Sequence, residues 1–452
     1  MASFRDQLAG FKGLRASLEK KEQKDAAMER KNEAARLASL RLGQRLVKAG
    51  RFIRNSILLK RSEASGGCIK KRRMGLLILI IDSLPFEPLW REWMQRQNGA
   101  TEVKVWIHAK HPDKVTSPWV LEKLIPRSFC PAWGSVDITR AELELLRVAV
   151  EDASDIQLFL FASESCIPIQ PLDTAVKSLF PVETSGTSSR PQSWLHFTDK
   201  PNNGYSNQQQ FEPLVKAGLP STCIWKADQW VALTRPHAEA VLALPKAFGE
   251  DLWPMFRAAS ASDEMYFPTC LALLGEIGPS GPKVVTEDAA SSCLGSVDGS
   301  KKEGGLEKES TLTKSTTGTG LGIEESMPPR AGEGVVNAGG KEQQQSVLRR
   351  RLTYCCWGDS PKSPETYEGL PSHVLERGIR EGSLLGRKFK AGTVKLEEWL
   401  AHMRAMEGKG DEGFHVQGVG KDSGNAGQDA VGRQAKKRRR EEGGPTGPQG
   451  DA

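Results

Sequence analysis

Several short motifs that would define a chemistry are missing from the sequence. Its eight cysteines include no Cys-x-x-Cys pair and no cysteine–histidine spacing typical of zinc sites. This excludes a zinc finger and a small disulfide scaffold, while free thiols or a few bridges both remain open. There is also no HExxH, no GxxxxGK[ST], no GxSxG and no Asp-x-Asp. In the same order, these absences argue against a zinc peptidase, a P-loop NTPase, a serine hydrolase and a metal-dependent sugar-nucleotide transferase.

Long apolar segments are missing as well. No run of 18 apolar residues occurs, so the sequence predicts no membrane-spanning helix, and its start lacks the apolar core of a signal peptide. Apolar residues make up 38% of the chain, whereas ordinary globular chains have ~45–50%. We expect a normal core that is diluted by disordered segments.

Charge is concentrated near the N-terminus. The whole chain has 63 basic and 56 acidic residues, a net of +7, whereas residues 1–73 have 20 basic and 7 acidic residues, a net of +13. Residues 1–62 are predicted to be helical, with apolar positions at a near-heptad spacing. Three interpretations stay open for this segment: a solvated helix or short coiled coil, a basic membrane-surface helix, or a transit peptide.

Strands and helices alternate over residues 74–277. Predicted strands are 76–81, 103–107, 157–161 and 230–233, and predicted helices are 85–97, one opening at Thr139 and 236–244. Thr139 and Glu142 have the spacing of a capping box. The alternation predicts an α/β fold with helices on both faces of the sheet.

Two segments have the composition of disordered chain. Residues 278–353 contain no aromatic residue, and the tail from 405 is rich in glycine. The expected organisation is a basic helical extension (1–73), a folded domain in two parts (74–277 and 347–404), a disordered insertion (278–346) and a disordered tail (405–452). Lys436–Arg440 in the tail is either a solvated charge run or a nuclear or nucleic-acid signal.

Four clusters follow one another along the folded part. They are Phe129-Cys130-Pro131-Ala132-Trp133-Gly134-Ser135, Ser163-Glu164-Ser165-Cys166-Ile167-Pro168, Trp225-Lys226-Ala227-Asp228-Gln229-Trp230 and Asp263-Glu264-Met265-Tyr266-Phe267-Pro268-Thr269. A fifth, Gly386-Arg387-Lys388-Phe389, comes near the end. In this order they resemble the core-2/I-branching β-1,6-N-acetylglucosaminyltransferase family, in its plant- and alga-like branch. Ala227-Asp228 replaces the usual Gly-Ser, and Met265 replaces the usual His.

The resemblance implies a fold and an activity. The fold would be GT-A-like, a twisted mixed sheet that binds a nucleotide sugar at its carboxyl edge. The activity would be an inverting, metal-independent transfer of a sugar, N-acetylglucosamine in most members, from a UDP-sugar to a glycan or glycoprotein hydroxyl. No cofactor and no metal are expected.

The resemblance also assigns roles to residues. Inverting transfer needs one base for the acceptor hydroxyl, which the family places at Glu264, with Asp263 orienting beside it. Lys388 and Arg351 would neutralise the diphosphate, because a departing UDP needs cations. The donor side would also include Ser163, Glu164 and His108, although a histidine in such a position is more often a hydrogen-bonded structural residue. The acceptor side would comprise Trp225, Lys226, Trp230 and Arg235, with core packing as the alternative for the two tryptophans.

A non-enzymatic alternative remains: an inactive relative on the same fold that binds glycan or nucleic acid. Family members act in the Golgi and secretory pathway and are anchored in the membrane. We therefore expect either peripheral membrane attachment through residues 1–62 or an anchor that is missing from the gene model.

Overall fold

The computed structural model describes residues 4–59, 71–97, 99–181, 191–198, 201, 208–278, 346–357 and 363–408. The predicted insertion and tail fall almost entirely outside these ranges, as does Lys436–Arg440. The helices are α1 (Phe4–Ile53), α3 (Glu87–Gln95), α4 (Pro118–Leu121), α5 (Val136–Asp152), α6 (Leu172–Leu179), α7 (Gln208–Lys216), α8 (Arg235–Phe248), α9 (Tyr266–Leu273), α11 (Ser372–Arg380) and α12 (Leu396–Glu407).

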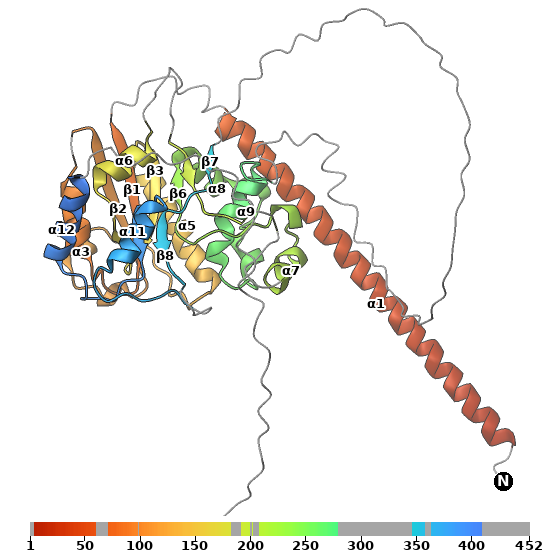
Figure 1. Ribbon diagram of the computed structural model, residues 1–452. Coiled ribbons are helices and arrows are strands. Elements are labelled where there is room, and N and C mark those ends of the chain that lie inside the picture. Colours follow the sequence, from red (N-terminus) through yellow and green to blue (C-terminus); the bar gives the residue numbers. More distant parts are fainter. Residues whose placement is uncertain are drawn as a thin grey trace, which may run out of the picture. The chain divides into compact units, whose positions relative to one another are not determined.

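A six-stranded mixed sheet forms the centre of the fold, with the strand order β2-β1-β3-β6-β5-β7 (Figure 1). Its strands are β1 (Arg72–Ile80), β2 (Thr101–Ala109), β3 (Leu158–Ser163), β5 (Ser193–Trp194), β6 (Ala232–Thr234) and β7 (Val347–Leu348). β1 is parallel to both β2 and β3, whereas β6 is antiparallel to β3 and β5. The predicted α/β class with a mixed sheet flanked by helices is confirmed, and it is consistent with a GT-A-like fold.

The strand order reverses beside β1. The chain passes from β1 through α3 to β2 on one side, and from β2 through α5 to β3 on the other side of β1. Because such crossovers are right-handed, α3 and α5 cover opposite faces of the sheet. In doubly wound sheets the ligand crevice lies outside the carboxyl ends of the strands where the order reverses. In this structure the order reverses between β1 and β3, so the expected ligand site lies at the carboxyl ends of these two strands.

A small second sheet begins four residues after the carboxyl end of β3. It has the order β4-β9-β8, built from β4 (Ile167–Pro168), β8 (Thr353–Cys355) and β9 (Leu385–Arg387). The Phe389 amide also donates to the Ser165 carbonyl (3.1 Å). Through β4–β9 and β5–β7 pairing, the chain after residue 346 shares both sheets with the chain before residue 278.

The capping-box prediction was wrong. α5 begins at Val136, with Ser135 as its N-cap residue, so Thr139 lies one turn inside the helix. The Thr139 hydroxyl is buried and pairs with the Ser262 hydroxyl at 2.8 Å. Spacing alone could not distinguish a local cap from this tertiary contact.

The predicted N-terminal helix is confirmed as α1, which continues into a π-helical turn at Arg54–Leu59. Its C-terminal part lies beside α8 and α9 (Figure 1). There Leu46, Ala49 and Ile53 are buried in the core. No helix in the described part of the chain is long and apolar enough to cross a membrane.

Candidate active site

Three carboxylates form a cluster where the start of α5 packs against the turn before α9. We call Glu142, Asp263 and Glu264 the carboxylate cluster. Glu142 and Asp263 are buried, whereas Glu264 is half-buried. Buried Lys226 forms an ion pair with Glu264, and the Ala227 amide donates to the Glu264 carbonyl (2.8 Å). The structure therefore brings together Asp263, Glu264 and Lys226.

The three carboxyl groups differ in burial, and burial raises the pKa values of two of them. Burial raises the pKa of Asp263 to about 7, with the neighbouring Glu264 charge adding to the rise. Burial, reinforced by the charge of Asp263, raises the pKa of Glu142 well above its usual range. Asp263 and Glu142 are thus buried carboxyls with raised pKa values, whereas Glu264 is half-buried and paired with Lys226.

Glu142 was missed as a site residue because its spacing from Thr139 indicated a helix cap. Its Oε1 accepts a hydrogen bond from Gln229 Nε2 at 3.2 Å, while its buried Oε2 has no partner in the described part of the chain. Asp263 Oδ1 is likewise buried without a partner there. The proximity of Glu142 to Asp263 depends on how α5 packs, so no local sequence signal could have found it.

Basic and acidic side chains also meet at the reversal of strand order. Glu164 follows β3, and its amide donates to the Leu79 carbonyl of β1 at 3.1 Å. Burial raises the pKa of the Glu164 carboxyl, and the charges of Arg387 and Lys388 partly offset this rise. Glu164, near the carboxyl ends of β1 and β3, is thus within electrostatic reach of both Arg387 and Lys388.

Arg387, which lies in the Gly386-Arg387-Lys388-Phe389 motif, has no role assigned from the sequence. Its guanidinium carbon lies 5.1 Å from the centre of the Trp230 ring, and its charge acts to lower the pKa values of both Asp263 and Glu164. Its buried Nε has no hydrogen-bond partner in the described part of the chain. Arg387 therefore lies between the carboxylate cluster and the strand-order reversal.

Arg351 is held in an ion-pair network. Its Nε contacts Asp228 Oδ2 at 2.9 Å, its NH1 contacts Glu381 Oε2 at 3.0 Å, and His196 Nδ1 lies 3.2 Å from the same Asp228 oxygen. Although burial works to raise the pKa of Asp228, His196 and Arg351 outweigh it, so that pKa is lowered. Asp228, the residue that departs from the family motif, thus binds the arginine predicted to bind diphosphate.

Ser163 and His108 lie at strand ends but are bonded internally. The Ser163 hydroxyl contacts the Ser165 hydroxyl (3.1 Å) and Cys166 Sγ (3.3 Å). His108 Nε2 accepts from the Phe129 amide at 2.9 Å, and burial lowers the pKa of this imidazole to about 4. A neutral histidine bonded to the backbone fits the structural interpretation of His108.

Three predicted acceptor residues occupy other positions. Trp225 is 1% exposed and packs edge-to-face on Phe197, while Trp230 is 6% exposed beneath Arg387. Both indoles therefore belong to the core in this structure. Arg235 binds carbonyls of the α5–β3 connection at the amino end of β3, the opposite edge of the sheet from Glu164. The structure does not bring Arg235 to the site.

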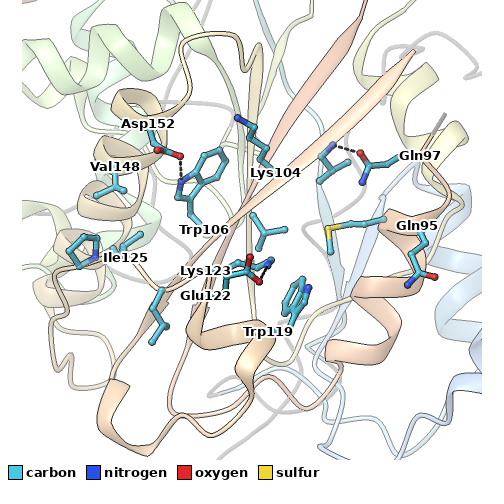
Figure 2. Close-up of a pocket in the computed structure, with 15 residues that line it drawn as sticks. Gln95, Gln97, Lys104, Trp106, Trp119, Glu122, Lys123, Ile125, Val148 and Asp152 are labelled. Carbon is cyan, nitrogen blue, oxygen red and sulfur yellow. Dashed lines mark hydrogen bonds and ion pairs between the residues drawn. The ribbon is translucent and has the colours of Figure 1, made fainter. Parts of the chain in front are cut away.

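A groove of about 710 Å³ runs along the edge strand β2, and none of the predicted site residues lines it (Figure 2). Trp106 Nε1 donates to Asp152 Oδ2 in its wall (3.2 Å), and Lys123 Nζ lies 4.6 Å from the centre of the Trp119 ring. Among the described residues, no three His, Cys, Asp or Glu side chains are arranged to hold a metal ion.

The fold is thus an α/β domain with acidic and basic side chains near its strand-order reversal. Residues 76–280 match the sequence model of the Core-2/I-Branching enzyme family. This match confirms the resemblance drawn from the motif order. It is also similar to "Glycosyltransferase BC10" of Oryza sativa subsp. japonica, with 24% identity over 175 residues. The match spans 38% of this chain and 40% of that relative.

Proposed function

We propose that this protein is a glycosyltransferase that moves a sugar from a UDP-sugar, with N-acetylglucosamine as the first candidate, to a glycan or glycoprotein hydroxyl. One observation carries the proposal. Inside the matched family domain, the half-buried carboxylate Glu264 is paired with Lys226 beside two buried carboxyls with raised pKa values. This is an arrangement that general-base chemistry uses.

The proposed reaction is a single displacement with inversion. Glu264 takes the proton of the acceptor hydroxyl as its oxygen forms a bond to the anomeric carbon. The bond from that carbon to the UDP oxygen breaks, and UDP leaves with the electron pair. Lys226 neutralises the ionised base before the reaction, and the proton that Glu264 gains afterwards passes to solvent.

Lys388 and Arg387 are proposed to stabilise the departing diphosphate without a metal. Both act on Glu164 at the strand-order reversal, where nucleotide ligands of such sheets bind. A fixed cation in a partly dry site can replace a divalent ion at a developing phosphate charge. Arg351 is a weaker candidate than the sequence indicates, because Asp228 and Glu381 already bind it.

Attachment to a Golgi or secretory membrane through α1 is a further part of the proposal. After Glu33 the described part of α1 contains only basic charges, including the exposed Arg36, Arg41 and Lys48. A basic helical surface of this kind attracts anionic lipid headgroups.

The test is the Glu264→Gln substitution, which keeps the shape of the side chain but removes the proton acceptor. We expect transfer to fall by at least ~10² while UDP binding, measured by calorimetry, stays unchanged. Glu122→Gln, at an exposed glutamate on the far side of β2, is the matched control and should be neutral.

A second variant covers the case in which Glu264→Gln unfolds because it removes the negative charge beside buried Lys226. Glu264→Asp keeps the charge and should fold, with transfer that is lowered but measurable. Full activity of Glu264→Gln would move the base to another residue.

A further inference from the structure

The side chain of Trp133 is almost fully exposed to solvent. Its side chain is 88% exposed, more than any other large hydrophobic side chain in the described part of the chain. Tryptophans are enriched at binding interfaces, because the indole combines a large apolar face with a polar N–H group. The two tryptophans that the sequence assigned to acceptor stacking, Trp225 and Trp230, are buried and cannot offer a ring face to a ligand.

The turn that carries Trp133 is joined directly to the carboxylate cluster. The Ser135 amide donates to the Ala132 carbonyl (3.1 Å), and Gly134 adopts a left-handed conformation with φ of 69°. The Ala261 amide then donates to the Gly134 carbonyl at 3.3 Å. Ala261 itself has φ of 56°, a conformation that alanine adopts only at a cost. Trp133 is therefore followed by Gly134, whose carbonyl is hydrogen-bonded to Ala261, and Ala261 lies two positions before Asp263.

Aromatic and arginine side chains stack at the same end of α5. Arg140 lies between two rings, with its guanidinium carbon 4.5 Å from the centre of Phe129 and 4.4 Å from that of Trp253. Arg257 continues the stack over Trp253 at 5.2 Å. Trp253 is half-buried and Arg257 is exposed. Planar donors beside a ring face suit a sugar, whose hydroxyls need hydrogen bonds while its C–H face packs on an aromatic ring.

We propose that Trp133 is the acceptor platform of this site: a pyranose ring of the acceptor glycan stacks on its indole. In this proposal the stacked sugar presents one of its hydroxyls to Glu264. The inference rests on the proposed function for the identity of the ligand, and it transfers the stacking role from Trp225 and Trp230 to a residue of the Trp-Gly-Ser element.

The test compares Trp133→Ala and Trp133→Phe with Phe52→Ala, an exposed aromatic on α1 that serves as the control (64% exposed). All four proteins, including the wild type, are measured in two assays. The first is binding to an array of neutral and uronic-acid-containing oligosaccharides. The second is UDP release from UDP-N-acetylglucosamine without an acceptor. Because Trp133 packs on little, Trp133→Ala should fold normally.

We expect Trp133→Ala to lose at least ~10-fold in apparent affinity for the oligosaccharides that the wild type binds. Trp133→Phe should recover most of the binding, and UDP release should be equal in all four proteins. A Trp133→Ala variant that binds like the wild type overturns the inference, as does a wild type that binds none of the oligosaccharides. If instead the wild type transfers no sugar to the oligosaccharides that it binds while Trp133→Ala still loses binding, the proposed activity fails but the role of Trp133 in binding glycan stands.

Discussion

At the scale of single residues, the buried carboxyl of Asp263 makes the protein sensitive to pH. Burial raises its pKa from 3.8 to about 7, so the folded state holds a proton that the unfolded chain releases near pH 4. Between these two values the folded state binds more protons than the unfolded state. The contribution of Asp263 to stability is therefore fully present below about pH 4 and is lost as the pH rises through about 7.

Asp263→Asn should remove this pH dependence. We expect the variant and the wild type to be similarly stable near pH 4, and the variant to become the more stable protein above pH 7, by at most roughly 4 kcal/mol. Urea unfolding at pH 4, 6 and 8 measures the difference, with Asp113→Asn on the exposed surface as the neutral control. A constant difference between the two proteins from pH 4 to pH 8 would contradict the raised pKa.

The sequence predicts some of these residues and not others, for physical reasons. Asp263 and Glu264 were found because they lie in one contiguous motif, and Lys226 because its motif has a fixed place in the order of elements. Glu142 was missed because its proximity to Asp263 comes from tertiary packing. Arg387 lies inside a quoted motif, but its contact with Trp230 depends on tertiary packing and gives no local signal. Trp225 and Trp230 fit either the core or a sugar surface by residue type, and only the burial of each indole in the structure distinguishes the two.

At the scale of elements, strands were easier to predict than helix ends. The apolar run 76–81 lies almost entirely within β1, because a strand that is buried on both faces must be apolar throughout. The start of α5 was misplaced because a polar pair can cap a helix or bond to another element. The strands β4, β5 and β7 have two residues each, too few for any periodic pattern.

The contact between α1 and α9 depends on the missing side chain of Gly50. A Cβ atom at this position would lie 2.1 Å from the carbonyl oxygen of Leu273. Helix propensity alone predicts that Gly50→Ala stabilises the protein by about 1 kcal/mol. The clash with backbone predicts the opposite sign, a loss of about 1–3 kcal/mol.

We expect Gly50→Ala to lower the midpoint of thermal unfolding. Lys48→Ala, at an exposed position two residues earlier, is the control and should leave the midpoint nearly unchanged. A higher midpoint for Gly50→Ala would mean that α1 does not pack on α9 as described.

At the scale of the whole molecule, the chain brings its site together from distant segments. The carboxylate cluster comes from α5 and the turn before α9, whereas Arg387 and Lys388 come from the chain that follows the insertion. The pairing of β4 with β9 joins these parts next to the strand-order reversal. The proposed chemistry therefore needs both parts of the folded domain, and the matched family region, which ends at residue 280, contains only the first.

We propose that charged side chains of this protein, rather than a metal ion, hold the departing diphosphate. The most direct test is sugar transfer from UDP-N-acetylglucosamine in excess EDTA, by the wild type and by Lys388→Ala. Lys390→Ala, two residues along and paired on the surface with Glu368, is the control.

We predict that the wild type and Lys390→Ala keep their activity in EDTA. Lys388→Ala should lose on the order of 10²–10³ in rate and should also bind UDP more weakly, because the diphosphate is already charged before the reaction. Activity that EDTA abolishes and Mn²⁺ restores in the wild type would contradict the account.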